Sequence, residues 1–463
     1  MARQLFGTDG IRGVAGEFPL DPRTVQATGI ALGRLASRLG RNPEVILGID
    51  TRESGPWLAE ELAGGLAQAG ARPRFAGLIT TPGIAYLTRT DTLVAGVMIS
   101  ASHNPYQDNG IKIFGHSGYK LSDQQEANLE SEILGLLGTG FTAGRVTLAE
   151  DPGLDERYLA YLSSTFSHSL EGFRLVVDCA HGAATRLAPA LFERLGASVD
   201  AIGCAPDGRN INLGSGALHV EELREAVLAR GADVGVALDG DADRAIFVSR
   251  RGKIVDGDGV MLVAARFLVE RGELSGPGGQ PTVVATVMSN LGLERALSKH
   301  GIRMPRTAVG DRYVLEEMLR IGAVLGGEQS GHVIFHNYST AGDGLLTTLR
   351  VLEVMRLSGA GLDELTSEFE HYPQRLVNIR VRARTPLGEL AEVNAEIRAA
   401  EEAFGDSGRI LVRFSGTELL ARVMVEGADG GRVDEHAYRI AAAIQRAIGS
   451  EAPDSCDQDE NSG

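Results

Sequence analysis

Cysteine is scarce in this chain of 463 residues, which contains three, at Cys179, Cys204 and Cys456. The three are odd in number and widely separated, and none belongs to a CxxC pair. A disulfide framework or a cysteine-ligated zinc site is therefore not expected. We predict three free thiols.

A basic surface and a long hydrophobic run are also missing. The net charge of -16 argues against nucleic acid as a partner, because its phosphates are bound by basic surfaces. A small anionic ligand stays compatible with this charge. No apolar stretch has the length of a membrane span, and residues 1–7 lack the apolar core of a signal peptide. We expect a cytoplasmic protein without a membrane partner.

The last residues lack positive charge altogether. Residues 451–463 contain five acidic side chains and no lysine or arginine, a composition that favours a disordered acidic tail. The whole sequence is 43% hydrophobic, and its length suggests about three or four domains.

The chain repeats one pattern of strand, helix, strand, helix and strand three times. Each first helix ends near a glycine suited to a C-terminal cap, Gly70, Gly196 or Gly301, and Ser54 is expected to cap the first of these helices. The expected strands are 45–50, 73–77 and 93–99; 175–178, 198–202 and 233–238; and 283–286, 303–307 and 323–325. The helices expected with them are 54–69, 184–195, 220–230, 291–300 and 312–320.

After residue 368 the pattern changes to strands at 377–382, 410–412 and 423–425 with helices at 390–404 and 433–448. We therefore predict an α/β fold of three similar mixed-sheet α/β domains and a C-terminal α+β domain. The predicted domains are 1–150, 151–253, 254–367 and 368–450, followed by the tail 451–463.

A different polar loop follows the last strand of each repeat. The first loop contains Ser102 and His103 and reaches Pro105 through Asn104. The residue before a proline avoids the helical region, so this loop is expected to be extended. Ser102 would lie at the carboxyl end of its strand, where open α/β sheets bind ligands. Taken alone, the segment also fits an ordinary polar turn.

The second loop carries Asp239, Asp241 and Asp243. Three carboxylates that converge on one point repel one another unless a cation lies among them, and oxygen ligands suit Mg²⁺. Arg244 and Arg250 occupy the positions where a calcium EF-hand needs glycine and glutamate, so that site is excluded. An aspartyl phosphatase nucleophile and an acidic surface turn remain alternatives.

Two further segments have the composition of anion sites. Residues 413–418, Arg-Phe-Ser-Gly-Thr-Glu, combine a guanidinium, hydroxyls and a glycine, and Arg422 lies nearby. Residues 7–13 form a glycine-rich loop with Arg12, which is equally explained by a sharp turn. His103 and His332, taken singly, also fit structural histidines.

Together these motifs resemble the α-D-phosphohexomutase family across nearly the whole chain. The motifs are FGTDGIRG (6–13), SASHNP (100–105), NGIKIF (109–114), DGDADR (239–244), GEQSGH (327–332) and RFSGTE (413–418). The first, the fifth and residues 287–292 are most similar to the branch that acts on glucosamine phosphates. The resemblance implies four domains around a central cleft and interconversion of glucosamine 6-phosphate and glucosamine 1-phosphate, on the route to UDP-N-acetylglucosamine.

The resemblance also implies the roles of the residues at the reacting phosphate. Ser102 is phosphorylated, passes its phosphoryl group to the sugar and is recharged by a sugar 1,6-bisphosphate, which also acts as activator. One Mg²⁺ is held by Ser102 with Asp239, Asp241 and Asp243. Arg244 and Lys112 offset the negative charge, Lys112 and His332 move protons in an order left open, and His103 supports Ser102.

Further matches concern the substrate. Glu328 and Ser330 correspond to residues that hold sugar hydroxyls, and Arg12 is a candidate anion contact. The phosphate that does not react is held by residues of the last domain: Arg413, Ser415, Gly416, Thr417 and Arg422. The family pattern has proline after the glutamate of this motif, whereas this chain has Leu419, so the loop departs from the family at this position.

Three rival functions remain at this point. A phosphoglucomutase or phosphomannomutase would use the same chemistry on a sugar with a 2-hydroxyl. A phosphatase would use Asp239 as its nucleophile, and a binding protein would hold sugar phosphates without reaction. Partners are expected to be small sugar phosphates, with a homodimer as the candidate assembly.

Overall fold

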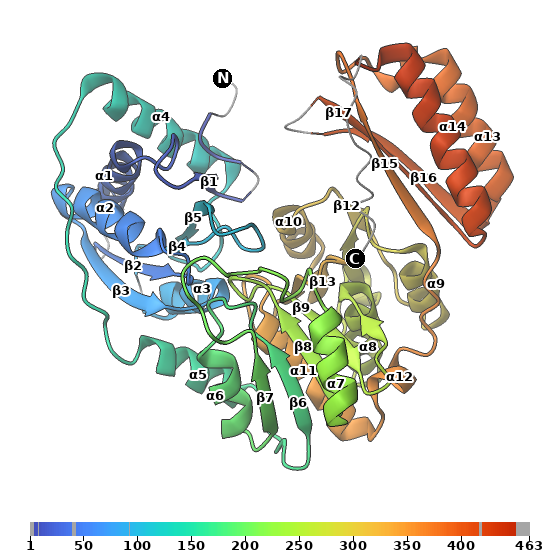
Figure 1. The fold of residues 1–463 in the computed structure, drawn as a ribbon, viewed down its shortest axis with the longest axis horizontal. Helices are drawn as coiled ribbons and strands as arrows, with labels where there is room; N and C mark the ends of the chain where they lie inside the picture. The colour runs from blue at the N-terminus through green and yellow to red at the C-terminus, as the bar shows by residue number, and fades with distance from the viewer. Residues whose placement is uncertain (1–3, 8, 39–42, 92, 416–418, 451–463) are drawn as a thin grey trace. The chain divides into compact units, whose positions relative to one another are not determined.

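The computed structural model describes residues 4–7, 9–38, 43–91, 93–415 and 419–450 (Figure 1). It divides into two compact units, Met1–Met288 with Gly301–Ser367, and Ser289–His300 with Glu368–Gly463. Gly416, Thr417, Cys456 and the predicted disordered tail lie outside the described residues. None of the helices in the described part of the chain is both long and apolar enough to cross a bilayer.

The first unit contains three mixed sheets. In spatial order, the first sheet consists of β1 (Ile11–Val14), β5 (Asp108–Gly115), β4 (Ala95–Ile99), β2 (Glu44–Ile49) and β3 (Arg72–Leu78). The second consists of β10 (Ile254–Val255), β9 (Ala245–Ser249), β8 (Val234–Leu238), β6 (Arg174–Asp178) and β7 (Ser198–Ile202). The third consists of β12 (Arg306–Thr307), β11 (Val283–Thr286), β13 (Leu325–Gly327) and β14 (Val333–Phe335).

The three sheets share one topology, which confirms the repeat. In each sheet, a central strand (β2, β6 or β11) lies parallel to a neighbour on either side. One of these neighbours (β4, β8 or β13) also pairs antiparallel with the strand that follows it in the chain (β5, β9 or β14). β4, β8 and β13 are therefore equivalent strands. The polar loops that follow them occupy equivalent places at the carboxyl ends of the three sheets.

Helices connect and cover these strands. They are α1 (Pro22–Arg38), α2 (Gly55–Gln68), α3 (Thr81–Thr90), α4 (Asp123–Thr139), α5 (Leu154–Ser164), α6 (Leu187–Arg194), α7 (Glu221–Arg230), α8 (Gly257–Glu270), α10 (Asp311–Ile321), α11 (Gly344–Ser358) and α12 (Leu362–Leu365), with a 3₁₀ turn η1 (Pro277–Gly279). The side chains of a strand alternate between the two faces of its sheet, so both sets are buried when helices cover both faces.

The first sheet shows how alternation divides the strand between two helical layers. Val45 and Leu47 belong to the core that includes residues of α1 and α2. In the neighbouring strand β4, Val97 faces the same core, whereas the opposite face packs on α3 so closely that a Cβ on Gly96 would lie 1.9 Å from Thr88 Oγ1. The glycine in this strand therefore permits the close approach of a helix.

The second unit has its own antiparallel sheet and core. Its strands, in spatial order, are β15 (Gln374–Arg380), β17 (Leu420–Gly427) and β16 (Gly408–Phe414). Its helices are α9 (Leu291–Lys299), α13 (Ala391–Phe404) and α14 (Gly430–Ile448), with 3₁₀ turns η2 (Leu387–Glu389) and η3 (Gly405–Ser407). Apolar residues of α13, α14 and the sheet form one buried cluster. The predicted fold class is confirmed, whereas the exact domain boundaries and the four-domain cleft stay predictions.

Several local predictions need correction. Ser54 is in the helical region and makes no side-chain cap; its Oγ instead accepts a hydrogen bond from Asn109 Nδ2 at 2.8 Å. The third-repeat strand begins at Leu325 and includes two glycines that the sequence pattern excluded. A Cβ on Gly326 would lie 2.7 Å from Met318 Sδ, so helix packing requires the glycine at this position.

Candidate active site

The loops after β4, β8 and β13 meet in the first unit. Ser102 Oγ donates to Asp239 Oδ2 at 2.6 Å, which joins the first loop to the second. His332 Nδ1 lies 3.6 Å from Asp243 Oδ1, which joins the third loop to the second. Residues from three distant parts of the chain thus form one buried site because equivalent strand ends of three sheets face one another.

The Ser102 loop is a tight turn and not the extended segment expected from Pro105. Asn104 N donates to Ala101 O at 3.1 Å, and Ser102 adopts a left-handed backbone with φ of 53°. Such a conformation costs a residue with a Cβ about 1–2 kcal/mol. The restriction imposed by a proline acts on Asn104 alone, so it did not reveal the turn two residues earlier.

Left-handed residues other than glycine gather around this site. Among the described residues there are five, and all lie in loops that follow strands of the first two sheets: Ser102, Ala180, His181, Asn212 and Ala242. Strained backbone persists where surrounding contacts over-determine it. The surrounding contacts therefore keep these loops in backbone conformations that their own residues disfavour.

The three aspartates form a group that fits a metal ion. One carboxylate oxygen from each lies within 4.8 Å of the others, and all three side chains are buried. Asp241 Oδ1 and Asp243 Oδ1 are buried without a hydrogen-bond partner among the described residues. Buried anionic oxygens without partners are costly, and a hard cation with oxygen ligands would satisfy them.

Electrostatics supports the same conclusion. Burial raises the pKa of Asp239 well above its ordinary value, and the neighbouring Asp243 and Asp241 raise it further. Burial also raises the pKa of Asp243, but Lys112 and His332 outweigh it and lower that pKa. Arg244 and the hydrogen bond from Ser102 lower the pKa of Asp239 without offsetting this increase, so a cation bound among the three carboxylates would favour its charged form.

Lys112 is the central cation of the site. Its Nζ lies 2.7 Å from Asp241 Oδ2, 3.3 Å from Asp9 Oδ2 and 3.5 Å from Asp243 Oδ2. Burial lowers the pKa of Lys112, but the charges of Asp241, Asp9 and Asp243 outweigh this effect and raise it. The side chain is therefore charged and held in place by three carboxylates.

Arg244 and His103 lie beside the serine and the aspartates. The Arg244 amide donates to Asp239 Oδ1 at 3.2 Å, and its guanidinium Nε is 3.9 Å from Asp243 Oδ1. His103 Nδ1 lies 3.3 Å from Ser102 Oγ. Burial lowers the pKa of His103 to about 4, assisted by the charges of Arg244 and Arg12, so its ring is neutral at neutral pH.

His332 is buried between acidic groups. Burial lowers the pKa of His332, but Asp243, Asp311 and Glu328 outweigh it and raise the pKa to about 9. The Gly342 amide donates to Nε2 at 3.1 Å. Full protonation of the ring would require that bond to be released, because a protonated ring nitrogen is a donor.

Residues 9–13 of the glycine-rich segment form the sharp turn that the sequence allowed, while the anion contact of Arg12 stays a prediction. Gly10 has φ of 81°, and a Cβ there would lie 2.3 Å from Ile111 O, so the turn requires glycine. The turn brings Asp9 to Lys112 and places Arg12 NH2 2.5 Å from Asp9 Oδ2. Arg12 thus borders the site while paired with Asp9.

Sequence reasoning missed an ion-pair chain that borders this loop. Lys120 Nζ contacts Asp9 and lies 2.5 Å from Asp311 Oδ2, while Asp311 is 3.7 Å from His332 Nε2. The rarity of lysine singled out Lys120, but no spacing related it to Asp311. Thr81 was also missed; its Oγ1 donates to Asp241 Oδ2.

The predicted sugar contacts lie in the loop after β13. Glu328 Oε1 accepts the Gly310 amide at 3.1 Å, and burial raises the pKa of this carboxyl group. Ser330 is half-buried, and its hydroxyl makes no hydrogen bond with any residue that the structure describes. Both side chains belong to the loop that carries His332.

In the second unit, two predicted phosphate ligands face each other across adjacent strands. Arg413 in β16 pairs in register with Arg422 in β17. Burial lowers the pKa of Arg413, and Arg422 lowers it further. Directly opposed residues of adjacent strands lie on the same face of a sheet, so the two guanidinium groups share one face. Ser415 follows β16, with its amide donating to Leu420 O at 2.8 Å.

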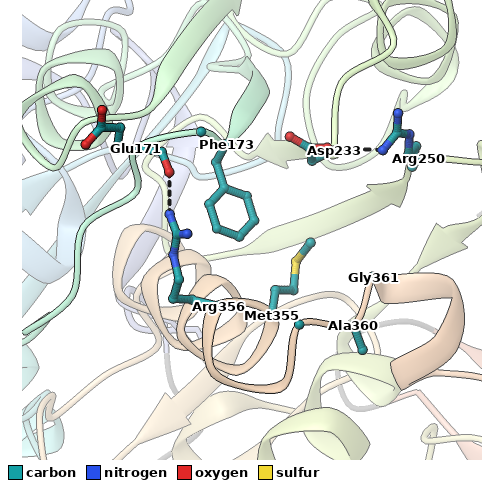
Figure 2. A pocket seen from close by; sticks show the side chains of 10 residues that line it. Glu171, Phe173, Asp233, Arg250, Met355, Arg356, Ala360 and Gly361 are labelled. Carbon is teal, nitrogen blue, oxygen red and sulfur yellow. Dashed lines mark hydrogen bonds and ion pairs between the residues drawn. The ribbon is translucent and has the colours of Figure 1, made fainter.

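A separate pocket opens at the amino ends of β6 and β8, two interior strands of the second sheet (Figure 2). Phe173 and Asp233 line it, and they precede the first residues of β6 and β8, opposite the loop of Asp239. Its two arginines are already engaged, because Arg356 donates to Glu171 O at 2.6 Å and Arg250 lies 3.5 Å from Asp233. This pocket is distinct from the buried site.

Comparison with known proteins agrees with the motifs. Four family models match in order: Phosphoglucomutase/phosphomannomutase alpha/beta/alpha domain I at residues 3–136, domain II at 156–252, domain III at 256–372 and the C-terminal domain at 376–443. Among solved structures, a phosphoglucomutase/phosphomannomutase family protein from Burkholderia thailandensis superposes with a TM-score of 0.77 at 24% identity, over 95% of this chain and 96% of that one.

Sequence relatives narrow the assignment. A phosphoglucosamine mutase of Solibacter usitatus is 59% identical over 97% of this chain and 100% of its own length. Another, from Koribacter versatilis, is 51% identical over 96% of this chain and 98% of its own. These matches confirm the resemblance, and the chain therefore belongs to the phosphoglucomutase/phosphomannomutase family and, within it, to the phosphoglucosamine mutases.

Proposed function

We propose that this enzyme interconverts glucosamine 6-phosphate and glucosamine 1-phosphate through a phosphorylated Ser102. The observation that carries the proposal is the position of Ser102 Oγ, 2.6 Å from Asp239 inside the three-aspartate cluster. A hydroxyl beside a candidate metal site, with Lys112 and His332 at the same cluster, has the groups that phosphoryl transfer needs.

The reaction consists of two transfers in opposite directions. The 1-hydroxyl of glucosamine 6-phosphate attacks the phosphorus on Ser102, the bond from phosphorus to Oγ breaks, and the sugar hydroxyl loses its proton. The bisphosphate then turns around and returns its 6-phosphoryl group to Ser102, while its 6-oxygen takes up a proton. Lys112 and His332 carry these protons within the site.

The carboxylates of Asp239, Asp241 and Asp243 would hold Mg²⁺ together with an oxygen on Ser102. When bound, the ion withdraws charge from the phosphoryl group. The phosphate adds about two negative charges to three carboxylates, so Lys112 and Arg244 are needed beside them. His103 is neutral and supports the Ser102 hydroxyl from its Nδ1.

Substrate orientation is assigned to two groups of residues. Glu328 and Ser330 hold the sugar hydroxyls, and Arg12 offers an anion contact. Arg413, Arg422 and Ser415 bind the phosphate that is not reacting, with Gly416 and Thr417 completing the loop. The support for this part is the in-register pairing of Arg413 with Arg422, because two guanidinium groups on one face of a sheet can both donate to one phosphate.

The decisive experiment compares wild type with Ser102→Ala. We expect intact-mass measurement to find one phosphate on wild type and none on the variant, and turnover to fall by about three orders of magnitude or more. Circular dichroism controls for folding. Full turnover by the alanine variant would refute the phosphoserine route. Steady release of inorganic phosphate without phosphorylated Ser102 would instead favour an aspartyl phosphatase.

Substrate class needs its own comparison. With glucosamine 1,6-bisphosphate as activator, kcat/KM for glucosamine 6-phosphate should exceed the values for glucose 6-phosphate and mannose 6-phosphate. Equal or higher efficiency with glucose 6-phosphate would contradict the amino-sugar assignment. A cytoplasmic location and a homodimer belong to the same proposal, and fractionation and light scattering test them.

A further inference from the structure

The backbone carbonyls of the Ser102 loop are held by an arginine to which the mechanism assigns no role. Arg52, between β2 and α2, has a fully buried side chain. Its guanidinium donates to the carbonyls of Ser102 at 2.9 Å, Asn104 at 2.8 Å and Asp108 at 3.1 Å, and also to that of Pro105. Four carbonyls between Ser102 and Asp108 therefore converge on one side chain.

Asn212 reaches the same turn from the loops of the second sheet. Its Nδ2 donates to Ser102 O at 2.9 Å and to Asn104 O at 3.1 Å. Its own backbone is left-handed, with φ of 59°, and its amide donates to Ala180 O at 2.9 Å. The Ser102 carbonyl oxygen thus accepts one hydrogen bond from a loop of the first sheet and one from a loop of the second.

The metal loop packs directly on this arrangement. A Cβ on Gly240 would lie 2.5 Å from Ser102 O and 2.9 Å from Asn212 Nδ2, so only glycine allows the observed approach. Gly240 follows Asp239, which accepts the Ser102 hydroxyl. Any movement of the Ser102 carbonyl would therefore move the loop that carries the first aspartate.

The contribution of Arg52 is geometric and not electrostatic. Its Nε lies 2.9 Å from Asp50 Oδ2, and both side chains are fully buried, so its charge is balanced within the protein. Because the peptide is planar, a Ser102 carbonyl that faces Arg52 and Asn212 turns the His103 N–H to the opposite side. That N–H makes no hydrogen bond with the described residues and is left available as a donor.

We infer that Arg52 and Asn212 are positioning residues that hold the Ser102 peptide in its left-handed conformation and so align Oγ with Asp239. The inference rests on the proposed role of Ser102 as the phosphoryl carrier. It assigns a function to two side chains that contact Ser102 through its backbone carbonyl and make no hydrogen bond with the three aspartates. Their loss should slow phosphoryl transfer while leaving substrate binding in place.

The test is Asn212→Ala in the full-length enzyme, because this half-buried side chain can be removed without leaving a buried charge. We expect kcat to fall by about 10²-fold, as a misplacement of roughly 1 Å can do. KM for glucosamine 6-phosphate should stay within about twofold. The rate at which glucosamine 1,6-bisphosphate phosphorylates dephosphorylated Ser102 should fall in parallel with kcat, and the ³¹P resonance of phosphorylated Ser102 should shift.

The matched control is Thr51→Val. Thr51 Oγ1 donates to His181 O at 2.6 Å, so this variant removes a hydrogen bond between loops of the same two sheets without touching the Ser102 turn. Its kcat should equal that of wild type. Arg52→Lys keeps the charge beside Asp50 but loses the planar fork of donors, and it should reduce kcat at unchanged KM.

An unchanged kcat in Asn212→Ala would overturn the inference, as would an equal loss of kcat in Thr51→Val. Ser102→Ala, measured in parallel, separates this result from the proposed function. An inactive Ser102→Ala beside a fully active Asn212→Ala refutes only the positioning role, whereas an active Ser102→Ala refutes the phosphoserine mechanism itself. If Arg52→Lys does not fold, Asn212→Ala and its control decide the question.

Discussion

At the scale of single residues, the most informative feature is a serine whose backbone has the conformation of a glycine. Ser102 needs its hydroxyl for the proposed reaction, and no residue with a Cβ adopts φ of 53° without cost. Ala242, between two of the aspartates, has the same handedness. The site therefore combines side-chain chemistry with backbone positions at which glycine would be more stable.

This conflict predicts an order of stability at Ser102. Glycine and alanine both remove the hydroxyl, so the two variants differ mainly in backbone strain. Ser102→Gly should be more stable than Ser102→Ala by about 1 kcal/mol, as measured by urea unfolding. At Ser100, whose φ is not positive, glycine should be less stable than alanine. The same order at both positions would show that left-handed strain at Ser102 is negligible.

At the scale of elements, the start of α11 depends on a buried carboxyl group. Asp343 caps this helix by accepting the Leu346 amide at 3.0 Å, and Tyr158 donates to its other oxygen at 2.7 Å. Burial raises the pKa of Asp343 to about 6, although these two hydrogen bonds oppose the increase. The folded protein therefore keeps a proton here that the unfolded chain loses near pH 4.

The sign of the pH effect follows from this difference. The stabilising contribution of protonated Asp343 is fully present below pH 4 and is lost as pH rises through 6. Asp343→Asn resembles the neutral form, so its free energy of unfolding relative to wild type should increase by about 2 kcal/mol between pH 4 and pH 7. Urea unfolding at both pH values measures it. A pH-independent difference would mean that Asp343 ionises normally in the fold.

At the scale of the whole molecule, the chain consists of two compact units with separate cores, and the proposed metal ligands all lie in the first. A ligand that binds only the folded state stabilises it in proportion to the logarithm of its concentration. Because the three aspartates repel one another without a cation, the effect of Mg²⁺ should be measurable on the first unit.

Mg²⁺ at 100 times its Kd should stabilise the enzyme by about 2.7 kcal/mol, and EDTA should reverse the change. Asp239→Asn should abolish this response while costing little stability in the presence of EDTA, because burial and its acidic neighbours already disfavour the charged form of Asp239. Calorimetry with and without Mg²⁺ provides the measurement. A full Mg²⁺ response in Asp239→Asn would exclude Asp239 as a ligand.

The sequence by itself determined the threefold repeat, the loops after β4, β8 and β13, and the residues that meet there. This was possible because strand and helix periodicity is local, and because Ser102, Asp239 and His332 follow equivalent strands. The motifs carried the assignment of family. The sequence pattern also placed β13 too early, since glycine in a strand has no local signal of its packing partner.

Only the tertiary structure decided how the Ser102 turn is held. Arg52 and Asn212 are 50 and 110 positions from Ser102, and both bind its carbonyl oxygen. A backbone carbonyl is present at every residue, so no pattern of side chains indicates which one a distant arginine or asparagine will bind. The left-handed serine and the chain of Asp9, Lys120 and Asp311 depend in the same way on how three sheets come together.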